Sequence, residues 1–201
     1  MILENKLNIT DQIELARAEE KISKQKAQQL FDSGDINKVE IGKFAGLAFI
    51  HAYLFEDIYH FAGKIRDVNI AKGDFRFAPL MYLEASLKHI DAMPQSTFDG
   101  IIEKYVEMNV AHPFREGNGR ATRIWLDLML KTQIKQVVDW NRVDKEEYLS
   151  AMQRSPVKDL EIKTLLKQAL ADQIDDRALF MKGIDVSYYY EGYSEFKTEE
   201  L

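Results

Sequence analysis

The sequence predicts a mainly α-helical protein, a compact helical bundle that carries one short β-hairpin. Apolar residues recur at helical spacing through most of the 201 residues, and residues that favour helix starts precede these stretches. Only residues 64–77 alternate between apolar and polar side chains in the manner of strands. With 46% hydrophobic and 30% charged residues, the chain has an ordinary globular composition. We therefore expect one domain that spans residues 1–201.

Two helices are predicted in the first part of the chain. Thr10 and Asp11 can cap the first, which runs to Ser33 and stops at Gly34. The second, residues 41–55, is apolar on most sides, so we expect it to be well buried. Its glycines permit close packing against a neighbour.

The segment 64–77 changes character. Val68 and Ile70 alternate with polar residues, residues 72–74 have the Lys-Gly-Asp chemistry of a turn, and Phe75 begins a second alternation. This pattern predicts a short β-hairpin.

Two further helices lead to the middle of the sequence. Pro79 suits the start of the first, residues 80–93, and Pro94 ends it. A Ser-Thr pair then caps another helix, whose apolar repeat brings His112 to its C-terminal end.

The helix that follows Gly119 is apolar on all sides except at Asp127, so we expect it to be the central, most buried helix. Three more helices are predicted over residues 145–154, 156–170 and 175–182.

Composition excludes several classes of protein. The chain has no cysteine, which excludes disulfides and thiolate metal sites, and its formal net charge of −6 argues against general nucleic-acid binding. No apolar run approaches the length of a membrane span, and the N-terminus lacks the pattern of a targeting segment. We expect a soluble, cytoplasmic protein that binds neither nucleic acid nor membrane.

The richest cluster of functional side chains is residues 112–120, His-Pro-Phe-Arg-Glu-Gly-Asn-Gly-Arg. Gly117 and Gly119 flank Asn118 at the start of a predicted helix, where outward-pointing backbone N–H groups and the helix dipole favour an anion. His112 supplies a base directly before this loop. The pattern indicates a phosphate site with a general base beside it.

Two arginines and a carboxylate complete the cluster. Arg120 and Arg123 stand three residues apart, so both can emerge on one helix face and hold successive phosphates. Glu116 offers an oxygen ligand to Mg²⁺ or another divalent cation, or it could simply cap the following helix.

These residues match, at every defined position, the signature of the Fic (filamentation induced by cAMP) family, His-Pro-Phe-x-Asp/Glu-Gly-Asn-Gly-Arg-x-x-Arg. The flanking sequence from about Ile41 onward also resembles this family. The resemblance implies a Fic-type helical bundle and a protein adenylyltransferase, which moves AMP from ATP to a Ser, Thr or Tyr hydroxyl of a target protein. His112 would be the base, Glu116 the Mg²⁺ ligand, and the phosphates would be held by Gly117, Asn118, Gly119, Arg120 and Arg123.

In Fic proteins a hairpin called the flap lies over the active site and pairs with the target backbone. The predicted hairpin stands where this flap should be. The resemblance therefore implies that the target docks on Lys64, Ile65, Arg66, Lys72, Gly73 and Phe75.

A second pattern lies near the C-terminus. Ser187 and Glu191, four residues apart and followed by Gly192, resemble the inhibitory helix of autoinhibited Fic proteins, here expected over residues 186–193. The resemblance implies that Glu191 pairs with Arg123 where the γ-phosphate of ATP would be held. The tyrosines around this helix are expected to pack, although one could be modified by the site itself, and residues 194–201 are expected to form a frayed acidic tail.

Other functions remain open from the sequence. The same residues could remove AMP from a modified protein, with Glu191 acting on water, or the chain could be a nucleotide-binding regulator without catalysis. The target is unidentified and could be the chain itself. The oligomeric state, a homo-oligomer included, is also left open.

Overall fold

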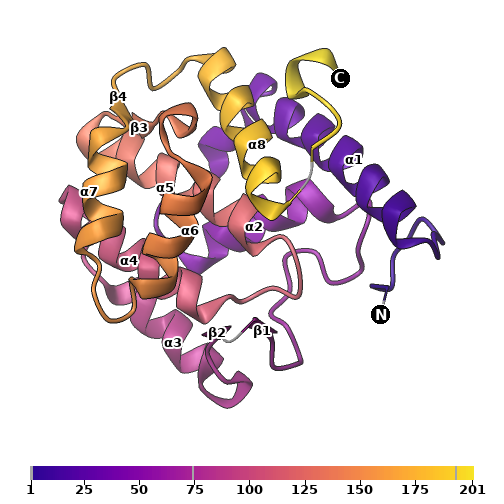
Figure 1. Cartoon of the computed structure of the whole chain (residues 1–201), viewed down its shortest axis with the longest axis horizontal. Coiled ribbons are helices and arrows are strands. Elements are labelled where there is room, and N and C mark those ends of the chain that lie inside the picture. The colour runs from indigo at the N-terminus through magenta and orange to yellow at the C-terminus, as the bar shows by residue number, and fades with distance from the viewer. Residues whose placement is uncertain (1, 74, 193) are drawn as a thin grey trace.

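Helix α5, Asn118–Ile134, lies in the middle of the helical bundle (Figure 1). The computed structural model describes residues 2–73, 75–192 and 194–201. Trp125, Leu126 and Met129 on this helix are completely buried. The expectation of a central helix after the glycine loop is confirmed, because its apolar groups are covered on every side.

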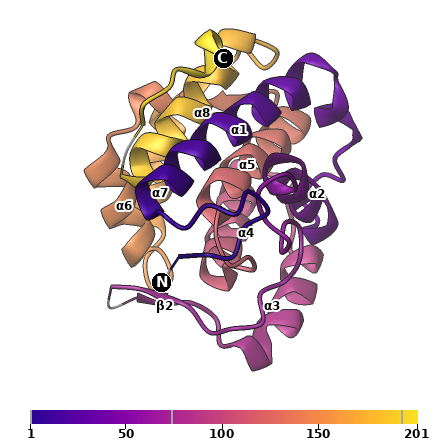
Figure 2. The same ribbon diagram turned by 90° about the vertical axis from the view of Figure 1, so that its right-hand side faces the viewer.

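The described part of the chain has seven further α-helices: α1 Gln12–Asp32, α2 Phe44–Phe55, α3 Leu80–Ala92, α4 Phe98–Ala111, α6 Lys145–Arg154, α7 Leu160–Gln168 and α8 Arg177–Glu191. Helices α2, α4 and α8 pack directly on α5, and α1 packs on α2 and α8. Figure 2 shows α8 alongside α1. The prediction of a mainly α-helical bundle is confirmed. None of the helices in the described residues is long and apolar enough to cross a membrane.

The strands are few and short. β1 Ala71–Lys72 pairs antiparallel with β2 Phe75–Arg76, and β3 Val137–Val138 pairs antiparallel with β4 Leu170–Ala171. The first ribbon is the predicted hairpin, although Val68 and Ile70 lie outside it. Asp74, which the sequence places in its turn, lies outside the described residues. The second ribbon was not predicted, because two-residue strands leave no periodic signal.

Side-chain caps mark the starts of several helices. Asp11, Thr97 and Asp144 each accept a backbone N–H from the first turn of the helix they precede. The start predicted for α2 was early, since Gly42 at φ +70° and the extended residue Lys43 delay the helix to Phe44.

The start predicted for α7 was also early. The N–H groups of Val157 and Lys158 both donate to Arg154 O and form a turn that ends α6. The helix therefore begins at Leu160 rather than at Pro156.

The C-terminal prediction needs two corrections. Residues 175–182 and the segment 186–193 are not separate elements, because α8 runs unbroken from Arg177 to Glu191, and residue 193 lies outside the described residues. Gly183 joins the two parts and lets the helix backbone approach Trp140, since a Cβ at Gly183 would stand 3.1 Å from Trp140 Cδ1.

The tail is not frayed. Thr198 is 0% exposed, and its backbone N–H and hydroxyl both donate to the Asp185 carboxylate on α8. The N–H groups of Glu195 and Phe196 donate to Glu20 on α1. The tail therefore ties α8 to α1, and its last turn is a short 3₁₀ helix, Thr198–Glu200.

Candidate active site

His112 ends α4 in the left-handed conformation, at φ +48°. Its ring stacks on Phe77, with centroids 3.6 Å apart and an angle of 17° between the planes. Its Nδ1 lies 3.2 Å from the Asn109 carbonyl oxygen, which only accepts, so Nδ1 carries the proton and Nε2 keeps a free lone pair. Burial lowers the pKa of His112 to about 4, so the imidazole is neutral near pH 7.

Arg66 holds the segment that leads to the hairpin against His112. Its Nε donates to the His112 carbonyl oxygen at 2.8 Å, Nη1 donates to Val68 O at 2.6 Å, and Nη2 donates to Ala78 O and Ala111 O. With 3% of its surface exposed, Arg66 cannot contact a docked protein. The expected docking role is therefore corrected for this residue, because its buried guanidinium donates all of these hydrogen bonds to carbonyl oxygens of its own chain.

Two side chains brace the glycine loop from inside. Phe114 is completely buried, so its ring anchors the loop in the core. The Asn118 amide accepts from Phe114 N at 2.8 Å and donates to Phe114 O at 2.7 Å. This amide was expected to face phosphate, but both of its ends are engaged within the loop.

His51 is a supporting residue that sequence reasoning missed. It is completely buried, its ring stacks on Phe114, and its Nε2 donates to the Glu116 carbonyl oxygen at 2.8 Å. Burial lowers its pKa to about 4, so it remains a neutral support. Its place in a helix predicted to be buried on most sides was the one available signal.

The N-terminus of α5 faces Glu191. Gly117 precedes the helix at φ +76°, and a Cβ at Gly119 would stand 2.8 Å from Glu191 Oε1. The carboxylate of Glu191 therefore lies over the backbone that the sequence assigns to an anion.

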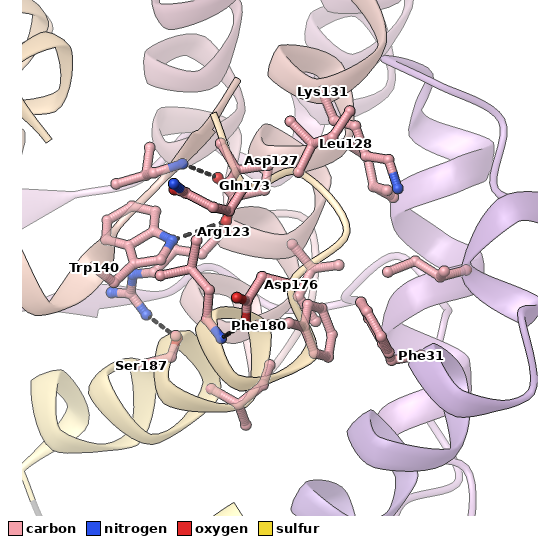
Figure 3. A pocket seen from close by; sticks show the side chains of 18 of the residues that line it. Phe31, Arg123, Asp127, Leu128, Lys131, Trp140, Gln173, Asp176, Phe180 and Ser187 are labelled. Atoms are coloured by element: carbon pink, nitrogen blue, oxygen red, sulfur yellow. Dashed lines mark hydrogen bonds between the residues drawn. The ribbon is translucent and has the colours of Figure 1, made fainter. Parts of the chain in front are cut away.

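Arg123 on α5 lies beside this carboxylate and also contacts Ser187 of α8. Its Nη1 donates to Ser187 Oγ at 2.6 Å and lies 3.9 Å from Glu191 Oε1. The guanidinium is also within 6 Å of the Trp140, Tyr148 and Tyr190 ring centroids. Figure 3 shows Arg123 between Trp140 and Ser187. Because Ser187 and Glu191 stand one helical turn apart on α8, both meet the same guanidinium.

Three cations act on Glu191. Burial alone would raise the pKa of its carboxyl, but Arg123, Arg120 and Lys72 hold that pKa below its ordinary value. Lys72 Nζ lies 3.5 Å from Glu191 Oε2 and brings the hairpin to α8. Glu191 is therefore ionised near pH 7.

These groups surround one cavity of about 460 Å³, a size that suits a small-molecule ligand. Its lining is Lys72, Gly73, Phe75, Phe77, Asn109, His112, Glu116, Asn118, Gly119, Arg123, Tyr148, Leu149, Met152, Gln153 and Glu191. Lys64 and Ile65, by contrast, line a separate cleft beside the N-terminal residues 2–4. Of the residues expected to dock the target, Lys72, Gly73 and Phe75 therefore line the cavity, whereas Lys64, Ile65 and Arg66 do not.

Arg120 does not line this cavity. It borders a smaller, mainly apolar cavity of about 60 Å³, which Arg123 also lines. Figure 3 shows this cavity with Arg123, Trp140 and Phe180 around it. The Arg120 guanidinium pairs with Glu19 and reaches Glu116 with Nη2 at 3.0 Å. A direct phosphate contact by Arg120 is therefore not supported by this arrangement.

Glu116 stands at the cavity with 44% of its side chain exposed. Its Oε1 accepts from Gly117 N at 2.9 Å and from Arg120, so the carboxylate also closes the start of α5. No group of three or more potential metal ligands occurs among the described residues. A single exposed carboxylate fits a Mg²⁺ ion that receives its other ligands from phosphates and water.

Comparison with known proteins identifies relatives of this chain. Residues 44–130, which include His112 to Arg123, match the model of the Fic/DOC family. The chain is 30% identical over 171 residues to "Probable protein adenylyltransferase y4lH" of Sinorhizobium fredii, covering 79% of this chain and 85% of that relative. It is 31% identical over 163 residues to "Protein adenylyltransferase VbhT" of Bartonella schoenbuchensis, covering 75% of this chain and 33% of that longer protein.

A solved structure shares the fold. The BepC protein of Bartonella tribocorum, crystallised with bound AMPPNP, superposes with a TM-score of 0.68 at 20% identity, over 86% of this chain and 94% of that one. At this identity the likeness concerns the fold alone.

Proposed function

The chain belongs to the Fic/DOC family, and from that premise we propose that it is a protein adenylyltransferase that transfers AMP from ATP to a hydroxyl of a target protein and is inhibited by its own Glu191. One observation carries the proposal: the free Nε2 of the neutral His112 shares a cavity with Glu116 and with the N-terminus of α5. A base, a cation ligand and an anion-binding helix start are the parts that this transfer needs.

In the proposed reaction the target hydroxyl attacks the α-phosphorus of ATP. A new oxygen–phosphorus bond forms, the bond to pyrophosphate breaks, and His112 Nε2 takes the hydroxyl proton. The N–H groups at the start of α5 oppose the negative charge that develops on the phosphate. Glu116 would hold the divalent cation, which when bound supplies positive charge against the phosphates.

The target would approach over the hairpin. Lys72, Gly73 and Phe75 border the cavity on the side of His112, so a backbone that pairs with this ribbon would present its hydroxyl to the base. Lys64, Ile65 and Arg66 have no part in this docking surface.

Inhibition would act through Arg123. Its guanidinium donates a hydrogen bond to Ser187 and forms an ion pair with Glu191, and the Glu191 carboxylate covers Gly119. A nucleotide phosphate that needs Arg123 must displace a negative charge that is already there.

Removal of AMP is the second candidate. Glu191 is held ionised in the same cavity as His112, so it could take a proton from water while His112 protonates the departing hydroxyl. In this reaction His112 acts as an acid instead of a base, and Glu191 has a catalytic role instead of an inhibitory one.

Isotope transfer tests the proposal. Wild type, Glu191→Gly and His112→Ala are incubated with Mg²⁺ and with ATP labelled on either the α- or the γ-phosphate, and label on protein is measured. We expect α-label, higher in Glu191→Gly than in wild type and absent in His112→Ala. Glu195→Gly is the control, because that carboxylate pairs with Arg17 at the surface and should leave transfer unchanged.

Other results redirect the assignment. Label from the γ-phosphate would indicate phosphoryl transfer. The absence of label from every variant, together with release of AMP from an adenylylated protein, would favour the second candidate.

A further inference from the structure

A buried chain of contacts joins α1 to the active-site loop. The Glu19 carboxylate pairs with Arg120 Nη1, and the exposed fractions of the two side chains are 9% and 7%. Arg120 Nη2 then donates to Glu116 Oε1 at 3.0 Å. A residue of the first helix therefore acts on a carboxylate of the catalytic loop through one guanidinium.

The position of this guanidinium is fixed from several sides. Arg120 lies between the rings of Phe55 and Tyr188, 5.0 and 4.9 Å from their centroids, and Nη1 also donates to the Tyr188 hydroxyl at 3.1 Å. The Tyr59 hydroxyl donates to the second oxygen of Glu19. These contacts hold both Glu19 and Arg120, so the guanidinium is kept in the orientation in which Nη2 reaches Glu116.

The contacts of Glu116 divide its two oxygens. Oε1 accepts from Arg120 and from Gly117 N, whereas Oε2 accepts no hydrogen bond from the part of the chain that the structure describes. One oxygen is thus engaged in orienting the carboxylate, and the other is available to a cation.

Charge gives Glu19 a second effect. Without Glu19, Glu116 would be the one carboxylate left to pair with Arg120 among the residues that the structure describes. The buried guanidinium would then compete more strongly with a divalent cation for that carboxylate. With Glu19 in place, the guanidinium is shared between two carboxylates. Both its orienting effect and its charge therefore favour a cation on Glu116.

We propose that Glu19 is a positioning residue of the cation site: it fixes and neutralises Arg120, and Arg120 in turn orients Glu116 so that Oε2 stays free for a divalent cation. The inference rests on the proposed function for the reaction that the cation serves, but cation affinity is measured without that reaction. Glu19 lies outside the family match at residues 44–130, and 101 positions separate it from Arg120. Supporting contacts of this kind change metal affinity through a ligand that they orient.

The test measures Mn²⁺ binding by electron paramagnetic resonance, with a non-hydrolysable ATP analogue present, in a Glu191→Gly background that removes the second cavity carboxylate. Glu19→Gln keeps the size of the side chain and removes its charge. We expect the Kd for Mn²⁺ to rise about 10-fold, with a parallel rise in the Mg²⁺ concentration that half-saturates label transfer.

Glu20→Gln is the matched control. Glu20 is the next residue of α1, is also buried, and pairs with Lys24 rather than with Arg120. Its loss should lower thermal stability and leave the Kd for Mn²⁺ unchanged. An equal rise in both variants would mean a general loosening of α1 and would overturn the proposal, as would an unchanged Kd in Glu19→Gln.

Tyr59→Phe keeps the test decisive if Glu19→Gln does not fold. It removes one hydrogen bond to Glu19 and keeps every charge, and we expect a rise in the Kd of about 2- to 3-fold. No change in the Kd of this variant would then count against the proposal. If the Kd rises as expected while no variant transfers label, the cation site stands and the proposed adenylyl transfer fails.

Discussion

The His112 imidazole lies flat against the Phe77 ring, with the two centroids 3.6 Å apart. Phe77 follows the hairpin that Arg66 anchors to the His112 carbonyl, so the segment that covers the base is also fixed to it. Phe77 therefore contributes to the burial that lowers the pKa of His112.

Replacing Phe77 with alanine should move the acidic limit of the reaction. In the intact protein, burial holds the pKa of His112 at about 4, so the base stays neutral down to about that pH. Exposure in Phe77→Ala would raise this pKa toward its ordinary value near ~6.5, so the base becomes protonated at a higher pH. The transfer rate of Glu191→Gly and Glu191→Gly/Phe77→Ala is measured from pH 4 to 8, with folding checked by circular dichroism. Coincident acidic limbs would contradict the covering role.

Replacing Ser187 with alanine should relieve part of the inhibition. Ser187 Oγ accepts from Arg123 at 2.6 Å, and a hydrogen bond to a charged group contributes about 1.5–3 kcal/mol. We expect basal α-label transfer to rise on the order of 10-fold, less than in Glu191→Gly, because Glu191 keeps its place. Ser33→Ala, at the exposed end of α1, is the control. Transfer equal to wild type would show that Ser187 does not restrain Arg123.

Replacing Lys24 with methionine should destabilise the attachment of the tail. Lys24 is completely buried, and its Nζ lies 2.8 Å from both the Glu20 and the Asp185 carboxylates. Breaking a buried pair leaves an uncompensated charge, so we expect a loss of about 3–5 kcal/mol in the free energy of unfolding. Urea denaturation measures it.

The surface pair of Lys131 and Asp175 supplies the comparison for Lys24. Lys131→Met should cost about 1 kcal/mol or less, because exposed ion pairs are weak. Equal losses in the two variants would mean that the Lys24 network adds nothing beyond a surface contact.

Replacing Arg66 with lysine should lower stability and transfer together. Lysine keeps the charge, but one ammonium cannot reach the four backbone carbonyls that the guanidinium joins. We expect a loss of about 2–4 kcal/mol, since buried acceptors lose their partners, and slower transfer because the His112 carbonyl is released. Arg76→Lys, exposed on β2, should change neither quantity. Wild-type melting of Arg66→Lys would exclude the anchoring role.

Much of the fold could be predicted because its signals are local. Capping residues such as Asp11 and Thr97 act within one turn of their helix, and the apolar repeat of α5 reports burial directly. The α7 start and the continuity of α8 could not be predicted, because a turn at Arg154 and the packing of Gly183 on Trp140 decide them.

The candidate site shows the same division. His112, Glu116 and Gly119 stand close in the sequence, and a helix end followed by a loop and a helix start brings them to one cavity by local geometry alone. The expectation that Glu191 lies near Arg123 came from resemblance, and the packing of α8 on α5 places the two side chains together.

The sequence by itself determined the helical class of this protein, its central helix and the cluster that begins at His112, since each depends on residues within a few positions of one another. Only the tertiary structure decided that Arg120 turns to Glu19, that Arg66 is an anchor, and that the tail is fixed by Glu20. These are buried polar groups whose partners lie far away in the sequence. A buried charge must be paired or hydrogen-bonded, and tertiary packing determines which distant group lies close enough to pair with it.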